Sequence, residues 1–370
     1  MVLTRRTLNS SSCAQPLKTG TESRNQWKGP AVRSSIYDRM LDSVRIYQTP
    51  STDPNLRVSE LDVELIHTLL GTEQPVPCDS LFDDCLFEKT MEAIATRNEA
   101  RVIKEISQLF TPSPEQLARR GATHLEPLIE NVDESWSNCI PLLKAHRPRP
   151  DFSVGLKPTA LTPHEIEKLG PFIGEWSTWS SVVATDRMYF PFLTAEAKCG
   201  NEALAVADRQ NAHSASIAVN AVVRLYRAVS RERELHRRIL AFSLSHDNRT
   251  VRISGHYPVI NGPDTAFYRH IVHNFDVGVL MGKEKWTAYR FTKNVYDIFF
   301  PLHLERIRAA IAGLPEPDVF SATSLSRLSV VEANLGPSTL DSAKVVSDED
   351  FSSDTAKPAL KRRKGKKAVE

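Results

Sequence analysis

The chain of 370 residues is nearly balanced in charge, with 47 Lys and Arg against 45 Asp and Glu and a net charge of +2. Hydrophobic residues make up 41% and charged residues 25% of it, enough for one well-formed core with additional segments. No run reaches the roughly 18 apolar residues that a membrane span requires, which predicts a protein without membrane partners. The five cysteines are odd in number and lack Cys-x-x-Cys spacing, so they argue for a reducing compartment and against a zinc site.

Residues 1–36 are rich in Ser, Thr, Asn and Arg and contain no apolar stretch of the kind found in a secretory signal. Their composition predicts a disordered segment and a protein that is not secreted. Residues 37–124 contain short helical patterns broken by loops with proline. Within this helical region, Ser59 followed by Asp62 predicts a capped helix start. We expect the region either to pack on the domain that follows or to form a small appendage.

Residues 125–315 alternate between helical and strand patterns. This mixture predicts a domain of the α/β (α+β) class with a mixed central β-sheet flanked by helices. The spacing of apolar residues and the turn residues between them define the individual elements. In chain order, we expect a helix over residues 125–144, strands over 151–156 and 189–198, a helix over 202–235, a hairpin of strands over 238–245 and 250–257, a strand over 267–279, and a helix over 284–314 interrupted at Pro301.

Two acidic residues, Asp151 and Glu196, belong to the first two predicted strands. Side chains alternate between the faces of a strand, so Glu196 and Lys198 point the same way while the carbonyl of Ala197 is available as a further ligand. If the strands are neighbours, both carboxylates face one cation. Mg²⁺ needs only one or two carboxylates and keeps several waters. The pattern predicts an Mg²⁺ (or Mn²⁺) site of Asp151, Glu196 and Ala197, with Lys198 placed to hold an attacking hydroxide or a developing charge.

A carboxylate and a lysine two residues apart are also common on solvated strand faces. The nearly all-apolar run that leads to Glu196 favours the metal site, because a buried carboxylate is costly unless it is paired or bound to metal. Gln210 lies on the apolar stripe of the following helix. It is expected either to orient the water or Lys198, or to satisfy the backbone of helix and sheet.

His246 and Asp247, close to Ser243 and Ser245, suggest a second kind of chemistry, that of a serine hydrolase. Such a nucleophile requires a sharp turn such as Gly-x-Ser-x-Gly, which is absent here. We therefore expect His246 and Asp247 to hydrogen-bond their own turn.

The chain resembles the PD-(D/E)xK nuclease-like superfamily, and more closely a fungal branch of uncharacterised proteins whose domains carry this core. The resemblance covers roughly residues 125–315. It is carried by Arg149-Pro150-Asp151, by Tyr189-Phe190-Pro191-Phe192-Leu193 leading into Glu196-Ala197-Lys198, by residues 207–214, by Phe242-Ser243-Leu244-Ser245-His246-Asp247, and by residues 251–257.

The resemblance implies metal binding by Asp151 and Glu196, a catalytic Lys198, and a supporting Gln210 similar to the glutamine that follows this motif in RecB-like members. Those members often have tyrosine four residues beyond the glutamine, where this chain has Ser214.

The superfamily core also begins with a helix that often presents a glutamate. Residues 125–144 are the candidate for this helix, with Glu130 and Glu134 available. Glu134 is favoured as a further metal ligand, because it lies beside Trp136 in mid-helix. The common core has a strand between this helix and Pro150, and no clear strand pattern occupies that place.

The resemblance further implies a restriction-endonuclease-like core and a metal-dependent nuclease that hydrolyses DNA or RNA. The alternative is a catalytically inactive nuclease-like fold that binds nucleic acid or protein as a scaffold. Nucleases of this fold often work as dimers when they cut both strands, so a homodimer is compatible with this interpretation. Because the net charge is small, nucleic acid must be bound by local basic patches, such as Arg147 with Arg149.

Residues 316–370 are rich in Ser and Asp and end in a dense basic run that includes Lys361, Arg362, Arg363 and Lys364. We expect this tail to be disordered. A basic run of this density predicts recognition by the nuclear import machinery or an electrostatic tether to nucleic acid. The protein is therefore expected to be nuclear, with the cytoplasm as the alternative.

Overall fold

The computed structural model describes residues 36–49, 52–143, 147–174, 179–199 and 203–317. The disorder predicted for the two termini falls almost entirely outside these residues, and so does the basic run from Lys361 to Lys364. Among the described residues, no helix is both long enough and apolar enough to span a membrane.

Within the described residues, eight strands form one mixed sheet in the order β1-β8-β7-β6-β5-β3-β2, with β4 paired to β5. β5 and β6 run parallel, whereas β2 with β3, β3 with β5, and β6 with β7 run antiparallel. The strands are β1 (Ile46–Tyr47), β2 (Leu128–Val132), β3 (Phe152–Leu156), β4 (Val183–Thr185), β5 (Met188–Ala197), β6 (Ala241–His246), β7 (Thr250–Asn261) and β8 (Asp264–Asp276).

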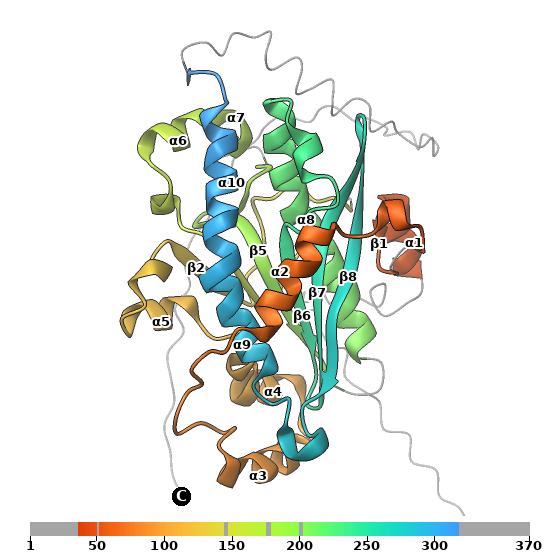
Figure 1. Cartoon of the computed structure of the whole chain (residues 1–370), viewed down its shortest axis with the longest axis vertical. Coiled ribbons are helices and arrows are strands. Elements are labelled where there is room, and N and C mark those ends of the chain that lie inside the picture. The colour runs from red at the N-terminus through yellow and green to blue at the C-terminus, as the bar shows by residue number, and fades with distance from the viewer. Residues whose placement is uncertain (1–35, 50–51, 144–146, 175–178, 200–202, 318–370) are drawn as a thin grey trace, which may run out of the picture.

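Helices cover both faces of this sheet, as Figure 1 shows. The described α-helices are α1 (Ile36–Ser43), α2 (Glu60–Gly71), α3 (Asp84–Ile94), α4 (Glu99–Ile106), α5 (Pro114–Arg119), α6 (Pro163–Lys168), α7 (Gly170–Ile173), α8 (Ala203–Ala228), α9 (Thr287–Asn294) and α10 (Phe300–Ala312). On one face, Thr194 of β5 bonds to Asn211 of α8. On the other, Phe242 of β6 packs against Phe291 and Phe299 beside α10. The predicted α/β class with a mixed central sheet and flanking helices is confirmed.

The N-terminal helical region packs on the sheet. β1 forms the edge of the sheet by pairing with β8, and a single cluster of buried side chains extends from Tyr37 to Leu314. The N-cap of α2 is Ser59, whose hydroxyl accepts a hydrogen bond from the backbone of Asp62, as the sequence predicted. Of the two alternatives for this region, packing on the following domain is therefore the one observed.

The helix expected over residues 125–144 is wrong. Residues 128–132 instead form β2, which pairs along its whole length with β3, from Leu128 opposite Leu156 to Val132 opposite Phe152. The pairing of β-branched Ile129 and Val132 with a neighbouring strand outweighs the weaker local preference for helix. The strand that was missing before Pro150 is thus found inside the segment assigned to the helix.

Gly155 lets β3 approach β5 closely. A Cβ atom at this position would lie 2.6 Å from Cγ of Met188 and 2.7 Å from the backbone oxygen of Tyr189. Both distances are far shorter than van der Waals contact, and the second involves backbone that has little room to shift. The close packing here holds the end of β3 against the start of β5, and the pairing of Phe152 with Ala195 places Asp151 beside the end of β5.

Candidate active site

Asp151 and Glu196 come together because β3 and β5 are neighbours in the sheet. Phe152 lies opposite Ala195, so the residue that precedes β3 meets the last residues of β5. The backbone N–H of Ala197 donates a hydrogen bond of 2.9 Å to Oδ2 of Asp151. This bond fixes the carboxylate of Asp151 at the end of β5, next to Glu196 and Lys198.

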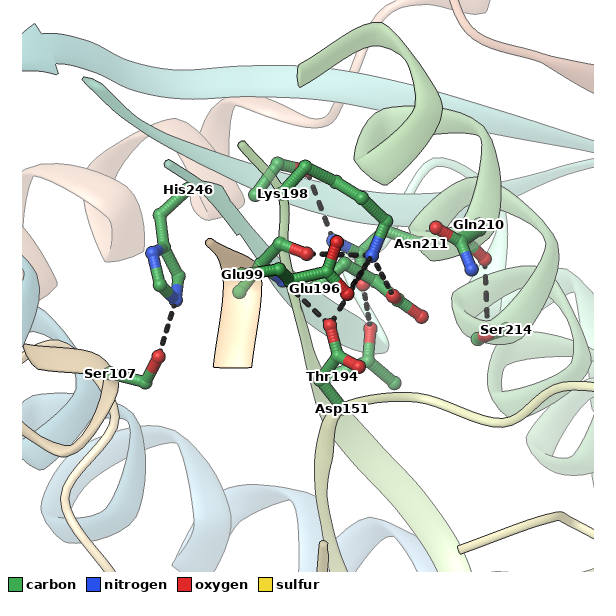
Figure 2. A network of polar contacts seen from close by, with 12 residues as sticks. Glu99, Ser107, Asp151, Thr194, Glu196, Lys198, Gln210, Asn211, Ser214 and His246 are labelled. Carbon is green, nitrogen blue, oxygen red and sulfur yellow. Dashed lines mark hydrogen bonds and ion pairs between the residues drawn. The ribbon is translucent and has the colours of Figure 1, made fainter. Parts of the chain in front are cut away.

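The ammonium group of Lys198 lies at the centre of this cluster (Figure 2). Its Nζ is 3.3 Å from Oε2 of Glu196, 3.4 Å from Oδ2 of Asp151 and 3.5 Å from Oε1 of Glu99. It also donates a 2.6 Å hydrogen bond to the backbone oxygen of Ala197. The carbonyl that was expected to be available for a metal therefore accepts a hydrogen bond from Lys198 in this structure.

Burial makes these contacts electrostatically strong. The exposed fraction is 7% for Asp151, 1% for Glu196 and 7% for Lys198. Burial by itself lowers the pKa of Lys198, but the charges of Glu196, Asp151 and Glu99 outweigh it and hold that pKa above its usual value. The lysine is therefore a cation at neutral pH, which is the condition under which buried carboxylates can stay charged beside it.

Glu99 is a member of the cluster that sequence reasoning missed. It is the first residue of α4, whose N-cap Asn98 accepts a hydrogen bond from the backbone of Arg101. A capping residue followed by an acid marks this helix start in the sequence. The expected domain boundary at residue 125 excluded it from consideration as a site residue.

Glu134 does not take the place that was expected for it. It lies exposed in the loop after β2, because the segment around it is not helical. In the part of the chain that the structure describes, Glu99 on α4 is the helix-borne glutamate that contacts Lys198. Glu130 lies in β2 rather than in a helix.

α8 brings Gln210 and Asn211 to the same cluster (Figure 2). Asn211 donates hydrogen bonds to the backbone oxygen of Leu244 and to Oγ of Ser245, and it accepts one from Oγ1 of Thr194. Asn211 therefore satisfies hydrogen-bonding groups of the sheet, which was one of the two roles considered for Gln210. Oε1 of Gln210 is buried and, among the described residues, has no hydrogen-bond partner.

An unpartnered buried oxygen is rare, because it loses its water without compensation. Ser214, which stands where RecB-like members often have tyrosine, donates its hydroxyl to the backbone oxygen of Gln210 at 3.0 Å. It does not bond to the side chain of Gln210. The orphaned oxygen therefore remains available for a water or a cation at this side of the cluster.

The residues that suggested a serine hydrolase do not form one. The Nδ1–H of His246 donates to the backbone oxygen of Asp247 at 3.2 Å, so its Nε2 accepts from the hydroxyl of Ser107 at 2.9 Å. Ser243 lies 2.8 Å from Nε2 of His256 instead, and this pair is fully buried. Burial lowers the pKa of His256 to about 3, with a smaller contribution from the charge of Arg269. Both histidines join elements of the fold.

The cluster contains oxygen atoms of the kind that a hard divalent cation prefers as ligands. In the described residues, no set of three or more His, Cys, Asp or Glu side chains has the arrangement of a metal site. The donors here are of another composition: two carboxylates, the backbone oxygen of Ala197 and the unpartnered oxygen of Gln210. Mg²⁺ sites commonly use one or two carboxylates with other oxygen ligands. In this structure the positive charge of Lys198 offsets the negative charges of Asp151 and Glu196, which are the charges that a bound cation would also offset.

The fold and the cluster define an α/β protein with a buried site of carboxylates and one lysine. The site lies where two paired strands meet and where a long helix covers the sheet. The chain belongs to the family described as "Domain of unknown function (DUF7924)", whose model matches residues 86–311. The matched segment begins before α4 and includes Glu99 together with the other residues of the cluster. No curated protein matches the chain.

Proposed function

We propose that the protein is a metal-dependent nuclease that hydrolyses phosphodiester bonds of nucleic acid at this cluster, in the manner of the PD-(D/E)xK superfamily. The observation that carries the proposal is the buried ammonium of Lys198 in contact with Asp151, Glu196 and Glu99. Burying two carboxylates and a lysine, with a third carboxylate partly buried beside them, is costly for stability alone, which favours a functional reason for the arrangement.

The order of the elements along the chain supports the same proposal. The resemblance implies a helix with a glutamate, then a strand, then the strand with Asp151, the strand with Glu196 and Lys198, and a helix with Gln210. The structure contains α4 with Glu99, followed by β2, β3, β5 and α8 in this order. Of the two departures noted in the sequence, the absent strand has a counterpart in β2, whereas Ser214 still stands where RecB-like members often have tyrosine. The helix-borne glutamate has a counterpart in Glu99.

In this proposal the carboxylates of Asp151 and Glu196, with the carbonyl of Ala197, would hold Mg²⁺ or Mn²⁺. Such an ion would lower the pKa of a bound water and offset negative charge on the reacting phosphate. Lys198 holds the attacking hydroxide or the developing charge, and its raised pKa keeps it cationic for that task. Oε1 of Gln210 orients the water, because it is buried beside the cluster and has no other acceptor role among the described residues.

The proposal extends to partners and location. The substrate is DNA or RNA, a homodimer would allow both strands to be cut, and the basic run from Lys361 to Lys364 would direct the protein to the nucleus. The sequence motif carries the last of these, since the run lies outside the described residues.

The test is a cleavage assay with supercoiled plasmid, linear duplex, single-stranded DNA and RNA, each in Mg²⁺, Mn²⁺ or chelator. We expect metal-dependent cleavage by the wild type and a loss of at least about a hundredfold in Glu196→Ala and Lys198→Ala, because each removes a group that acts on the transition state. Lys157→Ala and Glu73→Ala, in exposed or half-exposed ion pairs elsewhere, are the matched controls and should cleave as the wild type does.

Absence of cleavage on all four substrates, or equal cleavage by the site variants and the wild type, would contradict the proposal. The first result would favour the alternative of a catalytically inactive scaffold, which a binding assay on the same nucleic acids would then examine.

A further inference from the structure

The site residues are too deeply buried for a nucleic-acid strand to reach them as they lie. Glu196 is 1% exposed, and Asp151 and Lys198 are each 7% exposed. A phosphodiester must come within hydrogen-bond distance of these groups to react. Some element that covers the cluster must therefore move when substrate binds.

α1 packs on the end of α8 that carries Gln210, through the ion pair of Asp38 with Arg209. Tyr37 is 3% exposed, and its pKa is raised by burial and further by the negative charge of Glu196. The phenol thus lies within electrostatic reach of that carboxylate. α1 contributes one other buried side chain, Leu41, and it joins β1 through Arg45, whose φ of 59° lies in the left-handed region. It is a short element with a small buried face.

Asp38 joins α1 to α8 through a bidentate ion pair with Arg209. Nε of Arg209 donates to Oδ1 of Asp38 at 2.9 Å, and Nη2 donates to Oδ2 at 2.8 Å. Gln48 donates a further bond of 2.8 Å to Oδ1 of Asp38. Arginine binds a phosphate with the same fork that it uses for a carboxylate. Arg209 precedes Gln210 on α8, so this ion pair forms at the same end of the helix as the candidate active site.

The fork opens into a cavity of about 370 Å³ between α1, β1, α8 and β8. Arg269 lines this cavity and lies 3.2 Å from Asp208, which also receives Arg252 at 2.7 Å. With α1 in place, three carboxylates balance the positive charges of Arg209, Arg252 and Arg269. These carboxylates are Asp38, Asp42 and Asp208.

Two of these three carboxylates belong to α1 and leave with it. Three guanidinium groups would then face Asp208 alone, a net charge of +2. The arrangement becomes attractive to a phosphate only when α1 moves away.

We propose that Arg209, Arg252 and Arg269 form a phosphate-binding subsite for the nucleic-acid strand that enters the active site, and that Asp38 of α1 occupies this subsite in the present structure. The inference rests on the proposed nuclease function, since it assigns the phosphate to the substrate of that site. Asp38 acts as a stand-in for the phosphate, and α1 and the strand compete for Arg209.

The experiment measures binding without cleavage. Fluorescence anisotropy of a labelled 20-nucleotide single strand and of the matching duplex is recorded with the full-length protein in chelator. Asp38→Asn removes the competing charge and keeps the side-chain size, so it should bind more tightly than the wild type. Arg209→Gln should bind about tenfold more weakly, the loss of one charge-assisted contact.

The charge swap Asp38→Arg with Arg209→Asp separates phosphate binding from the anchoring of α1. It retains an ion pair between α1 and α8 but leaves no guanidinium group at position 209 of α8 to bind the phosphate. Its affinity should remain as low as that of Arg209→Gln. Glu234→Gln removes the same charge from an exposed pair with Arg231 and should bind like the wild type. In Arg209→Gln, the slope of log Kd against log salt concentration should fall by about one, as expected for one lost phosphate contact.

Wild-type affinity and salt slope in both Asp38→Asn and Arg209→Gln, or no binding by the wild type and Asp38→Asn alike, would overturn the subsite. Recovery of wild-type affinity in the charge swap would also overturn it, because the pair would then act only through the position of α1. Failure of the nuclease proposal is recognised separately: the binding changes would appear as predicted while no metal-dependent cleavage is found.

Discussion

Lys198 is the residue on which the account of the site depends most. One ammonium group lies within 3.5 Å of carboxylate oxygens from Glu99, Asp151 and Glu196, which belong to three separate segments of the chain. Since Lys198 is 7% exposed, these charges are poorly screened by water. The lysine therefore serves both the stability of the fold and the proposed chemistry.

Lys198→Met is predicted to destabilise the protein, because it keeps most of the side-chain volume and leaves three carboxylates close together without their cation. Removing one partner of a buried ion pair costs about 3–5 kcal/mol in free energy of unfolding. Adding Mn²⁺ should raise the free energy of unfolding of Lys198→Met by more than it raises that of the wild type. Urea unfolding with and without Mn²⁺ measures both effects.

Lys157→Met is the control for this prediction. Lys157 is 30% exposed in its side chain and lies 3.6 Å from Glu115. Its replacement should cost less than about 1 kcal/mol, the usual limit for an exposed pair. Equal losses in the two variants would show that the buried cluster has no special electrostatic role.

At the scale of elements, the site depends on how α8 and α4 are attached to the sheet. Asn211 ties α8 to β5 and β6 through three hydrogen bonds. The bond between Ser107 and His246 ties the end of α4 to β6, while Glu99 at its start contacts Lys198. α8 is thus fixed beside Gln210, and α4 is fixed at the end opposite to Glu99.

Asn211→Ala is predicted to lower the free energy of unfolding by about 2–4 kcal/mol, because buried partners on both strands lose their hydrogen bonds. Urea unfolding measures this loss. Asn248→Ala, which removes one exposed bond to the backbone of Ala95, should cost less than about 1 kcal/mol. A loss in Asn211→Ala no larger than in Asn248→Ala would contradict the anchoring role.

At the scale of the whole molecule, buried histidines make the fold sensitive to acid. His246, His256 and His303 are buried, and burial lowers the pKa of each. Each is therefore neutral in the folded state, whereas the unfolded chain binds a proton below a pH of about 6.5. The stability that they contribute is complete above that pH and falls as the pH decreases toward the folded pKa.

For His256, whose folded pKa is about 3, this predicts a loss of about 1.4 kcal/mol in the free energy of unfolding between pH 8 and pH 5.5. His256→Gln retains a partner for Ser243 and should lose less stability over this range. Urea midpoints at the two pH values give the comparison, with a substitution of the exposed His67 to Gln as the control. Parallel losses in His256→Gln and the wild type would contradict the prediction.

The sequence predicted the class of the fold and the two strands that place Asp151 and Glu196, because strand periodicity and turn residues are local signals. The pairing of these strands was a condition of the predicted site and is seen only in the structure. It did not predict Glu99, whose place in the site depends on how a separate helical region packs on the sheet. It also placed Glu134 in a helix, whereas this segment begins with β2. The pairing of β2 with β3 stabilises that strand, and a short stretch of sequence carries no signal of such a pairing. Asn211 was likewise missed, since its three partners lie far away along the chain.

The most direct test of the central claim is calorimetric titration of Mn²⁺ into the wild type, Asp151→Ala and Glu196→Ala. If these carboxylates hold the catalytic metal, the wild type will show saturable binding that both variants lose while remaining folded. Equal binding in all three proteins, or no binding by the wild type, would contradict the assignment of the cluster as a metal-dependent nuclease site.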